Sequence, residues 1–216
     1  MIYSPRNLLA YSIFAVIFTL GSPLTSHSQS AKNVMDKMRD TLKKQKEISI
    51  AYEQSYTWKS SNTGSKTTGR LDLKELKMFR LLTDEQTIVS DGETIWSYSA
   101  FTEQVIIERV SKSSGTKIPS DFLFDYPEDY YANLSEENKF EGEYLIELTP
   151  KDKSSFVTVI RIWVDSEDYL TRKIEYVDIN KNVTLWEITE INLYPEFDKS
   201  HFILKPPPGS KVIDLR

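Results

Sequence analysis

The hydrophobic pattern of the chain predicts one amphipathic helix followed by a long series of strands. Residues 31–47 carry apolar side chains at helical spacing among Lys, Asp and Arg, which predicts a helix of about four turns. From residue 48 to residue 59 apolar and polar positions alternate, which indicates a long β-strand. Shorter strand-like runs follow at 69–74, 77–82, 86–90, 94–99, 103–110, 140–149, 155–164, 169–178 and 182–193, and a closing edge follows at 211–214. The pattern therefore predicts a mainly β fold with a few helices (α+β), containing about ten or eleven consecutive antiparallel strands.

Turns and one irregular segment separate these strands. Residues 60–65 predict a turn by composition, and Asp91 with Gly92 predicts a tight hairpin because glycine tolerates positive φ. Residues 111–138 interrupt the strand pattern, and a short helix is expected to begin near Pro119. This segment is either a hinged lid or an ordinary helix docked for stability. The lid candidates are Ile118, Phe122, Leu123 and Phe124.

A sheet of this size is expected to curl into a concave shell, with the two helical segments across its mouth. Beyond about eight strands the interior of a barrel is larger than its own side chains fill, so it must be plugged, wet or occupied by a ligand. An apolar cavity favours an apolar occupant. The alternative is that the same side chains form an ordinary filled core. The candidate wall residues are Ile50, Tyr52, Tyr56, Leu71, Leu73, Phe79, Ile95, Val105, Ile107, Leu145, Phe156, Ile160, Ile162 and Leu185.

The beginning of the chain has the order of a secretory signal peptide. Arg6 precedes an apolar run over residues 8–20, and small residues follow it up to Ser28. The run is shorter than the roughly 20 residues that a membrane-spanning helix needs. We therefore expect a signal peptide over residues 1–28 and a single exported domain over 29–216, with a retained anchor helix as the alternative.

Composition and charge exclude several function classes. The 216 residues carry 27 Lys plus Arg against 32 Asp plus Glu, a formal charge of −5 that gives no reason to bind nucleic acid. The absence of cysteine excludes disulfides, thiolate catalysis and a lipidated N-terminal cysteine, and the seven scattered glycines provide no phosphate-binding loop. After removal of residues 1–28 the one histidine would be His201, which we expect to pack or lie on the surface. We therefore expect no metal site, no cofactor and no enzymatic activity.

Several segments of the chain follow one another in a distinctive order. They are Lys77-Met78-Phe79-Arg80, residues 84–98 with Asp91-Gly92 and Trp96, Glu103-Gln104-Val105, Leu148-Thr149-Pro150-Lys151, residues 202–205, Pro207-Pro208-Gly209 and Val212-Ile213-Asp214. Taken in this order, they resemble the periplasmic outer-membrane lipoprotein carrier family (LolA-type). The resemblance covers nearly the whole predicted mature chain and is strongest over residues 77–105.

The resemblance implies an incomplete antiparallel β-barrel closed by a helical lid over an apolar cavity, with Phe79 in the cavity wall and the helix containing Phe122 in the lid. It also implies a monomeric periplasmic chaperone without a cofactor. Such a protein accepts acylated lipoproteins from an inner-membrane ABC transporter and delivers them to an outer-membrane receptor. Many members carry Arg-Pro, with the Arg helping to hold the lid shut, where this chain has Glu75-Leu76. The resemblance therefore assigns no latch residue here.

Other functions remain open from the sequence alone. One is a carrier of another lipid or a glycolipid, and another is a lipid-sensing regulator of the same fold. An exported hydrolase would need a base near a nucleophile, with His201 as the candidate base. A structural or assembly protein would have a filled core instead of a cavity.

Overall fold

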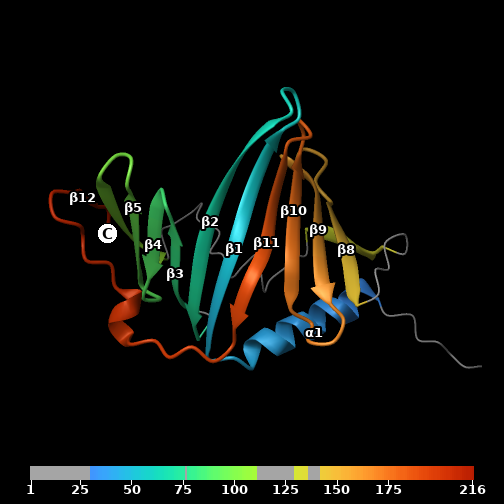
Figure 1. Cartoon of the computed structure of the whole chain (residues 1–216), viewed down its shortest axis with the longest axis horizontal. Coiled ribbons are helices and arrows are strands. Elements are labelled where there is room, and N and C mark those ends of the chain that lie inside the picture. Colours follow the sequence, from blue (N-terminus) through green and yellow to red (C-terminus); the bar gives the residue numbers. More distant parts are fainter. Residues whose placement is uncertain (1–29, 76, 111–128, 136–141) are drawn as a thin grey trace, which may run out of the picture.

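The computed structural model describes residues 30–75, 77–110, 129–135 and 142–216. These residues form the helix α1, a twelve-stranded sheet and the short 3-10 helix η2 (Figure 1). The elements are α1 (Ala31–Lys43), β1 (Glu47–Trp58), β2 (Thr63–Lys74), β3 (Met78–Thr83), β4 (Gln86–Ser90), β5 (Thr94–Ser99), β6 (Gln104–Arg109), β7 (Tyr130–Leu134), β8 (Glu143–Pro150), β9 (Val157–Asp165), β10 (Thr171–Asp178), β11 (Val183–Asn192), η2 (Lys199–Phe202) and β12 (Lys211–Asp214).

The sheet is open, with β12 at one edge and β7 at the other. The strand order is β12-β6-β5-β4-β3-β2-β1-β11-β10-β9-β8-β7. A mainly β protein with an unclosed sheet is therefore confirmed. The expected single meander of consecutive antiparallel strands is wrong in two respects. Two meanders, β1 to β6 and β7 to β11, join through the β1–β11 pairing, and β12 pairs parallel to β6.

The helix α1 forms where the apolar spacing predicts it. Ser30 caps its beginning, since the Ser30 hydroxyl accepts a hydrogen bond from the Asn33 amide. The helix ends at Lys43 and not at residue 47, because β1 already begins at Glu47. Its apolar stripe is buried in one core cluster with residues of β1, β2, β8, β9 and β10. The buried stripe consists of Ala31, Val34, Met38 and Leu42.

The two faces of the sheet carry separate apolar clusters. Phe79 belongs to the cluster that contains α1, and it pairs with Ser90 across β3 and β4. Its sheet neighbour Val89 points the other way, because successive side chains of a strand alternate between faces. Val89 belongs to a second cluster that includes Leu204 from the C-terminal segment. The C-terminal segment therefore covers part of the face opposite α1.

Polar contacts fix the C-terminal segment against β1 and β2. The carboxylate of Glu47 and the ammonium of Lys74 lie 2.5 Å apart. Glu47 accepts a hydrogen bond from the Phe197 amide, and Lys74 donates one to the Phe197 carbonyl. The ion pair thus satisfies both backbone groups of one residue in a segment that has no strand partner there.

Some predictions concern residues outside the described ranges or need adjustment. The expected signal peptide (1–28) and lid residues Ile118, Phe122, Leu123 and Phe124 lie outside the described residues. The β1–β2 turn is shorter than the expected 60–65, because β2 begins at Thr63 and Asn62 makes the turn with a φ of 52°. Strand β7 lies within the stretch expected to lack strands. Within the ranges described, no helix has both the length and the hydropathy needed to cross a bilayer.

Candidate functional site

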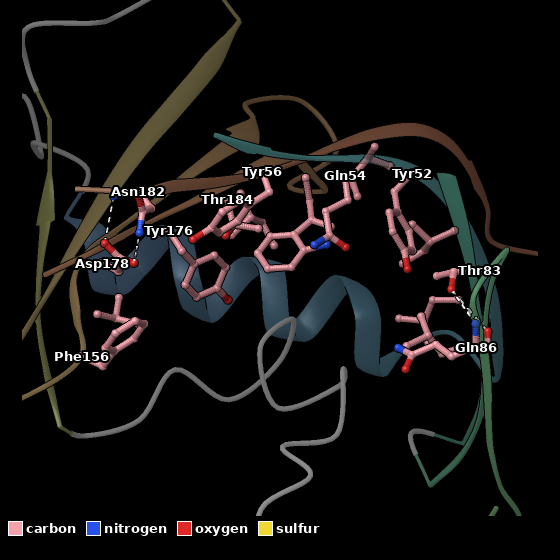
Figure 2. A pocket seen from close by; sticks show the side chains of 17 residues that line it. Tyr52, Gln54, Tyr56, Thr83, Gln86, Phe156, Tyr176, Asp178, Asn182 and Thr184 are labelled. Atoms are coloured by element: carbon pink, nitrogen blue, oxygen red, sulfur yellow. Dashed lines mark hydrogen bonds between the residues drawn. The ribbon is translucent and has the colours of Figure 1, made fainter. Parts of the chain in front are cut away.

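A pocket of about 540 Å³ lies on the face of the sheet that α1 crosses (Figure 2). Strands β1 to β4 and β9 to β11, with the turns beside them, provide its walls. Apolar and aromatic side chains predominate among the lining residues. They are Ile50, Tyr52, Gln54, Tyr56, Leu71, Leu81, Thr83, Gln86, Phe156, Val157, Ile174, Tyr176, Asp178, Asn182, Thr184, Trp186 and Ile188.

The two-residue period of the long strands explains why these side chains meet. On β1 every second residue from Ile50 to Tyr56 faces the pocket. The same period on β10 and β11 brings three alternate residues of each strand to the pocket. They are Ile174, Tyr176 and Asp178 on β10, and Thr184, Trp186 and Ile188 on β11.

Aromatic rings form the centre of the pocket wall. The rings of Tyr176 and Trp186 make an edge-to-face contact, with centroids 4.9 Å apart. Burial raises the pKa of Tyr176, and the nearby Tyr130 adds to that effect. Burial also raises the pKa of Tyr52. Both phenols therefore stay neutral at physiological pH, and these walls present rings and hydroxyls without charge.

The carboxylate of Asp178 lines the pocket and accepts hydrogen bonds from the turn that follows it. Asp178 accepts hydrogen bonds from the amides of Asn180 and Asn182, each at 2.8 Å. It accepts a third from the Asn182 side-chain amide, also at 2.8 Å. Figure 2 shows the two bonds from Asn182 at one end of the pocket. Because these donors satisfy the carboxylate, Asp178 shapes the pocket end and is poorly suited to bind a cationic ligand.

The structure places the predicted wall residues in several different surroundings. Ile50, Tyr52, Tyr56, Leu71 and Phe156 line the pocket. Another group lies in the cluster around α1 and does not line the pocket, and two residues belong to the cluster on the opposite face. Ile95 and Leu145 are buried elsewhere, and Leu185 lies between the pocket residues Thr184 and Trp186. The group around α1 is Leu73, Phe79, Ile160 and Ile162, and the two on the opposite face are Val105 and Ile107.

Sequence reasoning missed several lining residues. Leu81, Val157, Ile174, Tyr176, Trp186 and Ile188 were not among the candidates. Four of them lie on β10 and β11, for which strand pairing decides the face. The β1–β11 ladder places Trp186 beside Gln54, and Gln54 faces the pocket. This pairing joins segments more than a hundred residues apart, so local alternation alone does not reveal it.

The residues around His201 do not form a catalytic arrangement. His201 Nε2 lies 2.7 Å from Asp72 Oδ2, and the Ser49 hydroxyl donates to Asp72 Oδ1 at 2.6 Å. The carboxylate thus lies between hydroxyl and imidazole, so the imidazole is not placed to deprotonate Ser49. His201 also stacks on Phe197 with ring centroids 4.7 Å apart. In the described parts of the chain, no three His, Asp or Glu side chains form a metal-binding group.

Comparison with known proteins identifies the family. The family model described as "Outer membrane lipoprotein carrier protein LolA" matches residues 43–205. The chain belongs to this family. The resemblance found in the sequence is thereby confirmed.

Related proteins agree with this membership at low sequence identity. An outer-membrane lipoprotein carrier protein of Pasteurella multocida is 27% identical over 182 residues, covering 83% of this chain and 86% of the relative. One from Pseudomonas aeruginosa is 25% identical over 211 residues, covering 95% and 98%. Among solved structures, an uncharacterized conserved protein of Thermus thermophilus aligns with a TM-score of 0.57 at 12% identity, over 85% of this chain and 98% of that one. This last likeness concerns the fold alone.

Proposed function

We propose that this protein is a periplasmic lipoprotein carrier that shields the acyl chains of its cargo in the pocket on the face of the sheet that α1 crosses. The observation that carries the proposal is the aromatic and aliphatic lining of a pocket of about 540 Å³, in a chain of the LolA family. The proposed role is binding and release, and no catalytic group takes part in it.

The physical need for such a carrier follows from the solubility of acyl chains. Exposing a hydrocarbon chain to water costs about 0.8 kcal/mol for each CH₂ group. About two or three long chains on one lipoprotein therefore represent tens of kcal/mol, and unassisted movement through an aqueous space is negligible. A pocket with neutral phenols and an indole lowers this cost while leaving the cargo free of strong polar bonds that would slow its release.

The proposed route also includes export, two membrane partners, a lid and a monomeric state. The signal peptide over residues 1–28 directs the protein to the periplasm and is removed there. An inner-membrane ABC transporter supplies the acylated lipoprotein, and an outer-membrane receptor accepts it. The segment containing Ile118, Phe122, Leu123 and Phe124 acts as a lid over the pocket, and the carrier works as a monomer. The family membership supports lipoproteins as the cargo, and the steps in this paragraph are our proposal for how the cargo is delivered.

Mass spectrometry of the native protein tests the cargo directly. The protein is isolated from the periplasm without detergent, and the co-purifying molecules are identified after denaturation. We expect peptides of lipoproteins that carry acylated N-terminal cysteines. A free glycolipid or another lipid recovered at equal stoichiometry, without lipoprotein, would overturn the lipoprotein assignment and favour the other carrier function.

A pair of neighbouring substitutions tests the pocket assignment. Leu81 lines the pocket, whereas Leu82 is 43% exposed and pairs with Arg70 and Thr87. We expect Leu81→Glu to weaken binding of a fluorescent fatty-acid probe by about tenfold or more, because a carboxylate enters the apolar pocket. Leu82→Glu is the matched control and should bind the probe as the wild type does. Equal probe binding by both variants would contradict the pocket assignment.

A further inference from the structure

Three turns at one end of the sheet form a surface with an unusual combination of residues. We call it the basic tip, and it consists of residues 58–62, 151–156 and 179–182. In Figure 1 these turns lie together at the upper end of β1, β2 and β8 to β11. The Lys59 amide donates to the Asn182 side chain at 3.1 Å, and the Ile179 amide donates to the Phe156 carbonyl at 2.9 Å. These bonds hold the three turns in one surface.

Large apolar side chains of the basic tip are exposed to solvent. The exposed fraction is 42% for Trp58, 61% for Phe156 and 58% for Ile179. Phe156 also lines the pocket, so this side chain belongs both to the pocket wall and to the exposed surface of the tip. Trp58 extends the same row beyond Tyr56, with which it makes an edge-to-face contact at 4.5 Å. The basic tip is thus the outer rim of the pocket at its Phe156 end.

The basic tip carries a net positive charge, although the chain as a whole is acidic. It carries four exposed lysines, Lys59, Lys151, Lys153 and Lys181, against the one aspartate Asp152, whereas the whole chain has a charge of −5. Asp178, just before the third turn, is buried and bonded within that turn. At the same end of the sheet, the turns beyond β3 and β5 carry Asp84, Glu85 and Glu103 instead. Positive charge and exposed apolar side chains therefore occur together on the basic tip.

We propose that the basic tip docks on an anionic phospholipid surface. Lysines near such a surface are each attracted by about 1 kcal/mol, and aromatic side chains favour the boundary between headgroups and acyl chains. In this orientation Trp58, Phe156 and Ile179 enter that boundary, and the pocket opens toward the lipid. The Phe156 end of the pocket then lies next to the membrane at which the proposed transporter supplies the cargo or the proposed receptor accepts it. The docking itself depends only on the tip residues and not on the identity of the cargo.

Vesicle sedimentation tests this docking. The purified protein is mixed with vesicles of phosphatidylcholine alone or with added phosphatidylglycerol. We expect binding to the phosphatidylglycerol vesicles only, weakened by added salt because screening acts on exposed charges. Lys59→Gln/Lys153→Gln/Lys181→Gln should weaken binding by about tenfold or more. Trp58→Ser/Ile179→Ser should weaken it by about tenfold, and neither of these two residues lines the pocket.

Phe101→Ser is the matched control, because Phe101 is 95% exposed in the turn after β5, beside the acidic Glu103. We expect Phe101→Ser to bind vesicles as the wild type does. The triple lysine variant and the Trp58→Ser/Ile179→Ser variant should both bind the fatty-acid probe as the wild type does. This measurement separates a failure of docking from a failure of the proposed carrier function. The proposal would be overturned if the wild-type protein did not bind the anionic vesicles, or if the multiple variants bound them as strongly as the wild type does. The first of these results would instead indicate that a protein partner covers the tip.

Discussion

Gly69 lies directly opposite Tyr52 on the neighbouring strand, and the Tyr52 ring occupies the space that a side chain at position 69 would need. The ring lies against Gly69, and Tyr52 is 9% exposed although it lines the pocket. A glycine inside a strand weakens the strand, and an aromatic ring across it restores apolar cover. The pairing therefore sets how far the Tyr52 ring extends into the pocket.

Replacing Gly69 with alanine should change both stability and binding. The added methyl group overlaps the Tyr52 ring and forces it toward the pocket. We expect Gly69→Ala to lower the free energy of unfolding by about 1–3 kcal/mol, which is the usual cost of overpacking a core. We also expect it to lower the affinity for the fatty-acid probe. Urea unfolding and probe titration measure the two effects. Adding Tyr52→Leu to Gly69→Ala should restore part of the stability. Thr68→Ala, at the exposed neighbouring position, is the control and should change neither stability nor probe binding. Unaltered stability of Gly69→Ala would contradict the contact.

The buried carboxylate of Asp72 provides a second prediction. It is 4% exposed and is held by the Ser49 hydroxyl and by His201, which anchors the C-terminal segment. We expect His201→Ala to cost about 2 kcal/mol, because it removes a partner from a buried charged group. Asp72→Asn combined with His201→Ala should show a coupling energy of about 1–2 kcal/mol in a double-mutant cycle measured by urea unfolding. Strict additivity of the two changes would contradict this anchoring role.

The Glu47–Lys74 pair predicts a loss of stability in acid. The hydrogen bond from Lys74 lowers the pKa of the Glu47 carboxyl, and the bond from the Phe197 amide lowers it further. Because this pKa is lower in the folded protein than the ordinary value of 4.5, ionised Glu47 stabilises the fold above that value. This stabilisation is lost as the pH falls through the folded pKa. Urea unfolding at neutral pH and well below pH 4.5 measures it.

Glu47→Gln separates this contribution from that of other carboxyl groups. We expect the variant to lose about 1 kcal/mol at neutral pH and to show a smaller further loss in acid than the wild type. Glu93→Gln, at an exposed position, is the matched control and should keep the wild-type acid dependence. If both variants lost stability in parallel with the wild type, Glu47 would not be responsible.

The sequence predicts individual elements better than their partners. Alternation over residues 48–59 identifies β1 and the face on which Ile50, Tyr52 and Tyr56 line the pocket, because a strand this long keeps its period. The helix α1 follows from its apolar spacing in the same way. Strand β7 is missed because its five residues, Tyr130–Leu134, show no alternation of burial and are mostly exposed.

Which face of a strand belongs to the pocket depends on contacts that are distant in the sequence. Val105 and Ile107 alternate as wall residues would, but Leu204 of the C-terminal segment covers them on the opposite face. Phe79, expected in the cavity wall, is 1% exposed in the core around α1, so Phe79→Glu is expected to unfold the protein. Periodicity shows that two faces differ, and only the tertiary pairing shows what covers each of them.

The position of Trp186 offers a direct optical test of where the acyl chain binds. Trp186 lines the pocket in contact with Tyr176, whereas Trp163 lies with the Lys173 ammonium 5.0 Å from its ring centroid and does not line the pocket. A brominated fatty acid quenches indole fluorescence only at close contact. We expect it to quench the wild type, and Trp186→Phe should remove most of that quenching while Trp163→Phe leaves it in place. Quenching that survives Trp186→Phe undiminished would mean that the chain binds away from the wall formed by β10 and β11, and the carrier proposal would then need another site.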